Sequence, residues 1–429
     1  MQDIREMLSY SNFDTLMSEA NIKMLEKCYN NFPEYREIID VMFRERLRYS
    51  RTLEPTEALS TIFKNQDFKR KSGFYYMSRE FVNILINNSY LNNRDARRKL
   101  ENGTICVFNS LNGILPKMLR KIYPNARIVC LEYFSYHINH LKDLGFETYQ
   151  VRKENKNLIL SEEIINIMKK FGKFDLCIGN PPYNDIKTDD GPLLKNLYQR
   201  FLDKALEITK DGGWTLFVTP PGCLKTTVWD EDTKLFAKIK GMNLIEVNLR
   251  DAEKHFNVGT PVCYYLIQNA EYSGKTTIIS DEIVDIDIKT TSIIPRRVSN
   301  RTFSIINKIV NVENGENFNI RRNTTPKTNK YVTIKRRQHV NNCGVNAEIG
   351  GENTYDLNYD CDDPELIEFV LSSKLFRYLN TILRYDAIIY HKFWNGFRHP
   401  KKLNELTDKA LYTFYGLVDE DDIAEIENV

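Results

Sequence analysis

Four residues near the middle of the chain, Asn180-Pro181-Pro182-Tyr183, combine the groups needed to hold an exocyclic amine beside a flat ring. The Asn180 side-chain oxygen can accept a hydrogen bond from the amine. Proline fixes φ and has no N–H, so the two prolines stiffen the loop and the Pro181 carbonyl becomes a second acceptor. Tyr183 offers a face on which an extruded base can stack. Two acceptors on one NH2 group would favour a tetrahedral nitrogen whose lone pair attacks an electrophile such as a sulfonium methyl group.

A short apolar run at residues 174–179 precedes this loop and must position it. An apolar run that stops abruptly at an amide and two prolines predicts a buried strand of an α/β sheet. Open α/β sheets bind ligands in the loops at the carboxyl ends of their strands. On the tetrapeptide alone, a purely structural turn stays open as the alternative.

Asn-Pro-Pro-Tyr after a hydrophobic strand resembles the catalytic motif of S-adenosylmethionine-dependent amino methyltransferases. It is most similar to the gamma-class, TaqI-like N6-adenine DNA methyltransferases of restriction-modification systems, although protein-glutamine and RNA-guanine methyltransferases carry similar loops. The resemblance implies S-adenosylmethionine as the cofactor and in-line methyl transfer to a flipped adenine. It gives catalytic roles to Asn180, Pro181, Pro182 and Tyr183, and it implies neither a metal nor a covalent intermediate.

Two further segments extend the resemblance on either side of the tetrapeptide. Residues 73–78 are similar to a Gly-x-Tyr-Tyr-Thr-Pro segment that packs over the methionine end of the cofactor, which gives Tyr76 a cofactor-binding role. Ser78 is the predicted N-cap of the helix that follows. Residues 254–267 resemble the family's last motif, in which Phe256 would be the second stacking partner of the adenine. A core phenylalanine at a turn is an equal alternative.

The expected cofactor loop, after a strand that begins near Ile105, departs from the family pattern. An acidic residue, a proline and a Gly-x-Gly turn are usual there, whereas residues 107–115 read VFNSLNGIL. Only Gly113 clearly matches, and we interpret the acidic residue as replaced by an apolar one. Asn109 and its polar neighbours still suit a turn and tolerate left-handed backbone. We therefore predict that the loop persists, with Asn109 and Gly113 at the cofactor beside Asn180.

Glu132 ends the next predicted strand, at residues 126–132. It lies about 20 residues beyond the loop, the spacing at which a carboxylate on the second strand of a nucleotide-binding unit binds ribose hydroxyls. A solvated glutamate is the alternative. The family normally supplies an aspartate for the adenine amine near residues 145–151, where Glu147 and Gln150 are weak substitutes.

Beyond about residue 275 the α/β alternation gives way to clusters of arginine and lysine mixed with amides. Such clusters suit phosphate contacts and base-edge readout, and in the gamma class the target-recognition domain occupies this position. We expect an aromatic-basic loop at residues 393–399 and a solvated acidic stretch at residues 419–422. The candidate DNA-binding residues are Arg296, Arg297, Arg321, Arg322, Lys335, Arg336 and Arg337.

Length and composition set the domain organisation. The 429 residues allow two or three domains, and 60 Lys+Arg against 58 Asp+Glu leave no overall charge that identifies a partner. We predict a helical extension (1–70), a class I methyltransferase domain (71–272) and a target-recognition domain (273–429). The middle domain is predicted as a mostly parallel, doubly wound α/β sheet with an antiparallel element at one edge.

The cysteines and the hydropathy of the chain indicate the cellular compartment in which it works. No CxxC pair occurs, and no apolar run is long enough to span a bilayer. These features predict a cytoplasmic protein without metal, disulfide or membrane contact. The resemblance implies a bacterial or phage-infected cell and a location near the nucleoid. Four cysteines lie in apolar runs and are predicted to be buried thiols, namely Cys106, Cys130, Cys177 and Cys263.

Together these features predict a site-specific adenine N6-methyltransferase that acts on double-stranded DNA. Three alternatives stay open: an amino methyltransferase acting on RNA or protein, a catalytically impaired DNA-binding or regulatory subunit, and an enzyme that needs a second subunit. The intact catalytic tetrapeptide favours an active enzyme, whereas the atypical cofactor loop favours the second and third alternatives.

Overall fold

The computed structural model describes residues 77–428 except for gaps within that range. Tyr76, Arg321, Arg322, Arg336 and Arg337, together with the predicted extension at residues 1–70, lie outside the described residues. So does the side chain of Lys335. The gaps are 111–112, 134–137, 139–140, 155–156, 184–195, 225–233, 257–260, 292, 311, 314, 319, 321–327, 336–341, 346–356 and 384–390.

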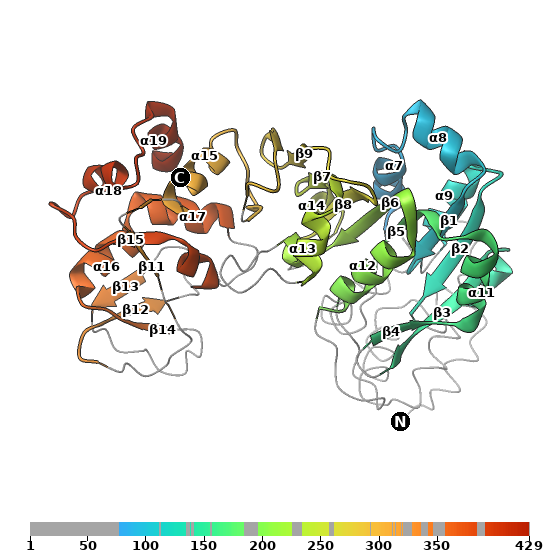
Figure 1. The fold of residues 1–429 in the computed structure, drawn as a ribbon, viewed down its shortest axis with the longest axis horizontal. Helices are drawn as coiled ribbons and strands as arrows, with labels where there is room; N and C mark the ends of the chain where they lie inside the picture. The colour runs from blue at the N-terminus through green and yellow to red at the C-terminus, as the bar shows by residue number, and fades with distance from the viewer. Residues whose placement is uncertain are drawn as a thin grey trace, which may run out of the picture. The chain divides into compact units, whose positions relative to one another are not determined.

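A ten-stranded sheet has the order β10-β9-β7-β8-β6-β5-β1-β2-β3-β4 (Figure 1). β1 pairs in parallel with β2 and β5, β2 also pairs in parallel with β3, β5 with β6, and β7 with β9. The outermost strands, β4 and β10, pair antiparallel with β3 and β9. The predicted α/β class is therefore confirmed, with an antiparallel strand at each edge. The strands are β1 (Thr104–Phe108), β2 (Arg127–Glu132), β3 (Glu147–Glu154), β4 (Asn157–Leu160), β5 (Phe174–Gly179), β6 (Thr209–Thr219), β7 (Asn243–Asn248), β8 (Cys263–Gln268), β9 (Thr276–Ile279) and β10 (Ile283–Ile286).

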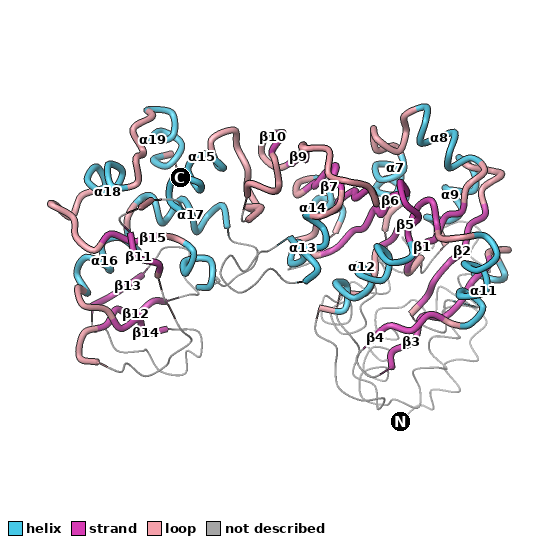
Figure 2. The backbone as a smooth tube through the Cα atoms, in the orientation of Figure 1, coloured by secondary structure: helices cyan, strands magenta, loops and turns pink. Residues whose placement is uncertain are grey.

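Helices alternate with these strands along the chain, as a doubly wound fold requires (Figure 2). Ser78 caps the first described helix, since its hydroxyl accepts a hydrogen bond from the Phe81 N–H at 3.1 Å. The sheet core includes the predicted buried cysteines. No described helix is long and apolar enough to cross a membrane. The helical elements of this part are α7 (Arg79–Ile86), α8 (Arg94–Glu101), α9 (Ile114–Ile122), α11 (Glu162–Phe171), α12 (Leu197–Ile208), η1 (Pro221–Leu224), α13 (Lys234–Lys240) and α14 (Asp251–His255).

The ends of β1 and β5 approach each other unusually closely. Phe108 and Gly179 are partners in the parallel register. A Cβ atom at Gly179 would lie 2.2 Å from the Phe108 carbonyl oxygen, so no larger residue fits without moving a backbone. The Phe108 ring packs edge-on against Phe201 of α12 and Phe217 of β6, at centroid distances of 6.1 and 5.3 Å. This contact fixes where the loops after β1 and β5 begin.

The chain divides into two compact units, one up to Thr219 with residues 268–270 and the other formed by Pro220–Ile267 and Glu271 onward. Strands β9 and β10 carry the sheet past residue 272, where we expected the methyltransferase domain to end. The predicted domain limits stay a prediction.

The second unit has a hydrophobic core of its own, formed between residues 293 and 426. Trp394 and Phe397 are buried in it, and the Trp394 indole N–H donates to Asn380 Oδ1 at 2.8 Å. The expected aromatic-basic loop at residues 393–399 is therefore wrong for Trp394 and Phe397, which pack in the core. The elements here are α15 (Thr302–Val310), β11 (Gly315–Asn317), β12 (Tyr331–Lys335), β13 (Asn342–Val345), β14 (Leu357–Asp360), α16 (Pro364–Ser372), α17 (Lys374–Leu383), η2 (His391–Gly396), β15 (Arg398–Pro400), α18 (Asp408–Phe414) and α19 (Glu420–Glu427).

The predicted solvated acidic stretch at residues 419–422 is exposed at its first three residues, but the prediction is wrong for Asp422. Asp422 is fully buried, and its Oδ2 lies 2.7 Å from the Lys308 ammonium of α15. Arg301 pairs with Asp419 at 3.2 Å and also with Asp421. Because a buried carboxylate needs a charged partner, this cluster ties α19 to α15.

Gly179→Ala should destabilise the protein strongly, because the new methyl group overlaps the Phe108 backbone. We expect the free energy of unfolding to fall by about 3 kcal/mol in urea titrations. The matched control is Gly241→Ala, where the nearest heavy atom would lie 3.4 Å from the new Cβ. Equal stability of the two variants would contradict the close approach of β1 and β5.

The stability of the second unit should fall as the pH drops below about 6.5. Burial of His399 against Phe318 lowers the pKa of the imidazole in the folded state, although the Pro400 carbonyl and Glu316 oppose this shift. The unfolded chain then binds the proton more readily, so acidification favours unfolding by up to about 1.4 kcal/mol per pH unit. Urea titrations followed by Trp394 fluorescence should show this slope in the wild type and lose it in His399→Phe.

Candidate active site

Three predicted site residues meet at the carboxyl edge of the sheet. Asn109 follows β1, Glu132 ends β2 and Asn180 follows β5. The register places Phe108 beside both Leu131 and Gly179, so the three polar residues begin at neighbouring strand ends. All are buried, with 3%, 0% and 1% of their surfaces exposed. The solvated alternative for Glu132 is therefore wrong.

Asn109 joins the first loop to the catalytic loop. Its side-chain Nδ2 donates to the Asn180 backbone carbonyl oxygen at 2.8 Å, in a buried hydrogen bond. Its own N–H donates to the Leu131 carbonyl at 2.8 Å. Asn109 has a φ of 54°, in the left-handed region that asparagine tolerates better than most residues. We expected an apolar residue in the acidic position, but Phe108 points into the core and the residue at the strand end is Asn109.

Glu132 and Gly113 hold the rest of this loop. Glu132 Oε1 accepts a hydrogen bond from the Ser110 N–H at 2.5 Å. The Gly113 N–H donates to the Ser110 carbonyl at 3.0 Å, which closes a turn before α9. Gly113 has a φ of 77°, and a Cβ there would lie 2.7 Å from a methyl carbon of Leu144. The predicted turn is confirmed at Asn109 and Gly113, while residues 111–112 lie outside the described part.

The polar atoms of the loop fit a ligand that carries hydrogen-bond donors. Asn109 Oδ1 is buried and has no hydrogen-bond partner among the described residues. Buried polar atoms are nearly always paired, so a donor from a bound molecule suits this position. The ammonium of an amino acid moiety is such a donor, and Glu132 offers a buried carboxylate one strand away. These residues are compatible with S-adenosylmethionine.

The catalytic tetrapeptide is buried at its prolines and at Tyr183. The Tyr183 ring lies edge-on to the ring of Tyr198 on α12, at a centroid distance of 6.4 Å and an interplanar angle of 77°. Tyr198 is thus a neighbour of the motif that the sequence analysis did not place at the site. Whether a base stacks on Tyr183 stays a prediction.

Phe256 ends the short helix α14 and is 7% exposed. A hydrogen-bond network around Asn248 fixes the start of this helix. Asn248 Oδ1 accepts from the Asp251 N–H at 2.8 Å, and its Nδ2 donates to the Tyr264 hydroxyl at 2.8 Å. The stacking role of Phe256 and the alternative of a core phenylalanine both stay open.

Glu147 and Gln150, the two weak substitutes for the adenine-binding aspartate, lie in different surroundings on β3. Glu147 lies at the start of β3 and receives two hydrogen bonds of 2.7 Å from Arg127, whose guanidinium lowers the pKa of the carboxyl. This ion pair holds Glu147 at the amino end of β3. Gln150 is instead the register partner of Glu132, at the edge where the three site residues meet.

The candidate DNA-binding arginines also differ in environment. Arg296 is half-buried and pairs with Glu253 at 3.0 Å, and its backbone N–H donates to the Ile382 carbonyl. Arg297 is exposed. Because Arg296 already has an anionic partner, Arg297 is the better placed of the two for a phosphate contact. The assignment of these residues to DNA stays a prediction.

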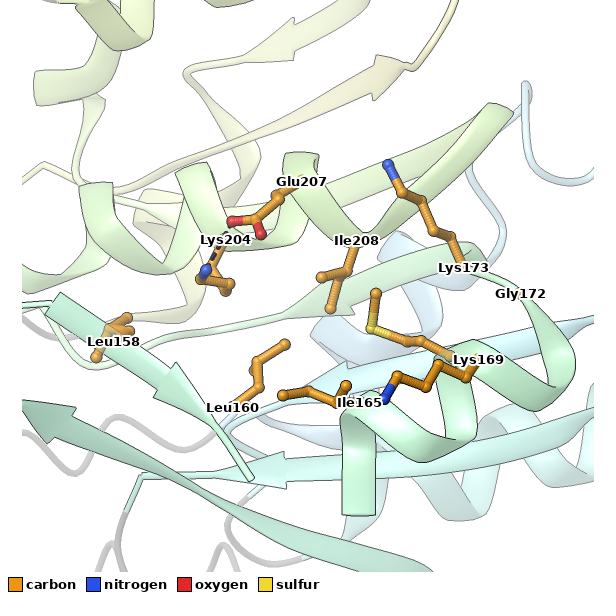
Figure 3. A pocket seen from close by; sticks show the side chains of 10 residues that line it. Leu158, Leu160, Ile165, Lys169, Gly172, Lys173, Lys204, Glu207 and Ile208 are labelled. Atoms are coloured by element: carbon orange, nitrogen blue, oxygen red, sulfur yellow. Dashed lines mark hydrogen bonds and ion pairs between the residues drawn. The ribbon is translucent and has the colours of Figure 1, made fainter. Parts of the chain in front are cut away.

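A cavity of about 540 Å³ lies between β4, α11 and α12, away from the residues above (Figure 3). Aliphatic side chains such as Leu158, Leu160 and Ile208 form much of its lining. Lys204 and Glu207, which also line it, pair with each other at 2.6 Å. It contains none of the predicted site residues. Within the described ranges, no group of three His, Cys, Asp or Glu side chains could hold a metal.

Residues 114–245 match the family model described as Eco57I restriction-modification methylase. This segment contains Glu132 and the whole Asn-Pro-Pro-Tyr tetrapeptide. The predicted resemblance to restriction-modification methylases is confirmed. Membership of the gamma class stays a prediction.

One curated relative of the chain is a modification methylase. The modification methylase CviBIII of Paramecium bursaria Chlorella virus NC1A is 30% identical over 138 residues, which cover 29% of this chain and 35% of the relative. The chain therefore spans about a third of the length of this methylase.

Solved structures of methyltransferases are similar to the chain at low sequence identity. A class I S-adenosylmethionine-dependent methyltransferase from Listeria monocytogenes is 12% identical, with a TM-score of 0.34 over 61% of this chain and 89% of its own. The M protein of the type I restriction enzyme EcoKI is 10% identical, with a TM-score of 0.32 over 62% and 67%. The fold class rests on the strand order of the chain itself.

Glu132→Ala should destabilise the ligand-free protein, because it leaves the buried Ser110 N–H without its acceptor. We expect a loss of about 1–3 kcal/mol in the free energy of unfolding. Glu132→Gln keeps an oxygen at the same position and should lose less than half as much. Urea titration of both variants measures this difference, and wild-type stability of Glu132→Ala would contradict a structural role for the Ser110 hydrogen bond.

Proposed function

We propose that the chain is a site-specific DNA methyltransferase that transfers a methyl group from S-adenosylmethionine to the N6 of adenine. One observation carries the proposal. The Asn-Pro-Pro-Tyr loop lies at the carboxyl end of β5 and is hydrogen-bonded to the loop after β1, which is where this fold binds its ligands. The family match over the same segment supports it.

The cofactor would be held by the loop after β1 and by the end of β2. Asn109 Oδ1 suits the ammonium of the methionine moiety, and Glu132 suits the ribose hydroxyls. Gly113 keeps the loop backbone free of a side chain at its turn. Tyr76 and Asn180 complete the proposed contacts. When bound, S-adenosylmethionine supplies a methyl group that its sulfonium charge already activates.

The target amine would be held by the tetrapeptide. Asn180 Oδ1 and the Pro181 carbonyl each accept one hydrogen bond from the N6 amine, and the proline rings keep the two acceptors in a fixed relation. Tyr183 and Phe256 would contact the faces of the extruded ring. Because the methyl donor is already activated, the protein contributes mainly orientation and exclusion of water, and the amine proton passes to solvent.

Double-stranded DNA is the proposed partner, recognised through the basic clusters of the second unit. Arg297 is the exposed candidate among the described arginines. The other proposed contacts are Arg296, Arg321, Arg322, Lys335, Arg336 and Arg337. A second subunit and a cytoplasmic, nucleoid-associated location belong to the same proposal.

Asn180→Ala should abolish most methyl transfer and reduce cofactor affinity much less, since Asn180 is only one of several proposed cofactor contacts. Incubation with radiolabelled S-adenosylmethionine and double-stranded DNA, followed by mass spectrometry of the nucleosides, should show N6-methyladenine for the wild type. We expect a loss of about 100-fold in the variant, because the amine is no longer oriented. Binding of S-adenosylhomocysteine, measured by calorimetry, should weaken by a much smaller factor than methyl transfer does. The control is Asn125→Ala, at an exposed amide.

Two results would contradict the proposal. Label that appears in RNA or protein but never in DNA would reassign the substrate. Cofactor binding without methyl transfer to any of these substrates would favour a catalytically impaired, DNA-binding subunit.

A further inference from the structure

We propose that Asn109 is a positioning residue that sets the orientation of the Asn180–Pro181 peptide, and that this role requires a carboxamide and excludes a carboxylate. The inference rests on the proposed function, since it concerns the same loop. It assigns to Asn109 a task beyond the cofactor contact expected from its position.

The hydrogen bond acts on the peptide that links both proposed acceptors. Asn109 Nδ2 lies 2.8 Å from the Asn180 carbonyl oxygen, and both residues are buried. A peptide group is planar, so fixing the Asn180 carbonyl also fixes the plane that leads into Pro181. The Pro181 ring then restricts the φ of Pro181 itself, which leads to its carbonyl. A single donor thereby constrains the side chain of Asn180 and the carbonyl of Pro181 together.

The backbone of Asn109 is held in turn by a hydrogen bond to β2. Its N–H donates to the Leu131 carbonyl on β2, and its left-handed backbone turns the side chain away from the course of β1. Its neighbour Ser110 is held by Glu132. The carboxamide therefore extends from a support that is tied to β2 and reaches the loop after β5. This arrangement suits a positioning role better than a mobile side chain would.

A carboxylate at position 109 would fail for two reasons. Ionised aspartate has no hydrogen to donate, so one of its oxygens would face the Asn180 carbonyl oxygen at hydrogen-bonding distance. The buried Glu132 carboxylate already accepts from the adjacent Ser110 N–H, and a second negative charge beside it would be repelled. The acidic residue usual in the family at this loop therefore does not fit the present chain.

The side-chain oxygen of Asn109 connects the proposed cofactor site with the catalytic loop. Asn109 Oδ1 has no partner among the described residues. A donor that binds to this oxygen polarises the amide and strengthens the Nδ2–H···O bond to Asn180. Occupation of the cofactor site should therefore tighten the catalytic loop through one side chain.

The test compares Asn109→Gly with Asn109→Asp. Glycine adopts the left-handed backbone without strain and removes the side-chain hydrogen bond to the Asn180 carbonyl. Aspartate keeps the shape of the asparagine side chain and adds a negative charge. We expect both variants to lower kcat about 100-fold at pH 8. The deficit of Asn109→Asp should shrink about tenfold for each pH unit lowered, since the protonated acid can donate, until that acid is mostly protonated. Asn109→Gly should show the wild-type pH profile. Asn125→Asp is the charge control.

A second readout does not depend on activity. Hydrogen exchange at the Tyr183 amide should be at least about tenfold faster in ligand-free Asn109→Gly than in the wild type. S-adenosylhomocysteine should slow this exchange in the wild type and not in the variant, with circular dichroism used to confirm that both are folded. Wild-type kcat and wild-type exchange in Asn109→Gly would overturn the inference. If the wild type transfers no methyl group but the exchange difference appears, the proposed function fails while the positioning role stands.

Discussion

The site depends on the absence of a side chain at Gly179. A glycine at the last position of β5 lets this strand end against the backbone of Phe108, with no room for even one additional carbon atom. Two loops that are 71 residues apart in sequence therefore begin side by side, close enough for the Asn109 amide to reach the Asn180 carbonyl. The Phe108 ring supports the same approach from the other direction, because it packs edge-on against Phe201 and Phe217. Close packing, rather than charge, brings the proposed catalytic and cofactor-binding residues together.

The charged groups of the first unit are divided between the two edges of the sheet. At the amino ends of the strands, Arg127 pairs with Glu147, and Asp175 accepts hydrogen bonds from Lys210 and from the Thr104 N–H, each at 2.8 Å. Burial of Asp175 would raise the pKa of its carboxyl, but these donors outweigh it and keep the pKa below its usual range. At the carboxyl ends of β1, β2 and β5, the described site residues are the neutral amides Asn109 and Asn180 and the carboxylate Glu132. Ion pairs stabilise the edge of the sheet at the amino ends of its strands. At the carboxyl ends, the buried Asn109 Oδ1 has no partner among the described residues and can accept a hydrogen bond from a ligand.

Much of this arrangement could be predicted from local sequence. Residues 174–179, the apolar spacing of α12 and the acidic end of β2 each identify their element, because burial and periodicity are local properties. The contact between Asn109 and Asn180 could not be predicted, since it depends on the register between strands distant in sequence. The residue at the acidic position was likewise misassigned, because Phe108 is buried in the core and Asn109 is the first residue after the strand. Asp422 was taken as solvated with its exposed neighbours because its partner, Lys308, lies more than a hundred positions away.

The most direct test of the account is calorimetric titration of the purified protein with S-adenosylmethionine and S-adenosylhomocysteine, with and without double-stranded DNA. The account predicts one site per chain with micromolar affinity for both, weakened by Glu132→Ala and unchanged by Lys173→Ala at the rim of the remote cavity. Absence of binding in every condition would contradict the central claim that the loops after β1 and β5, with the end of β2, form a cofactor site.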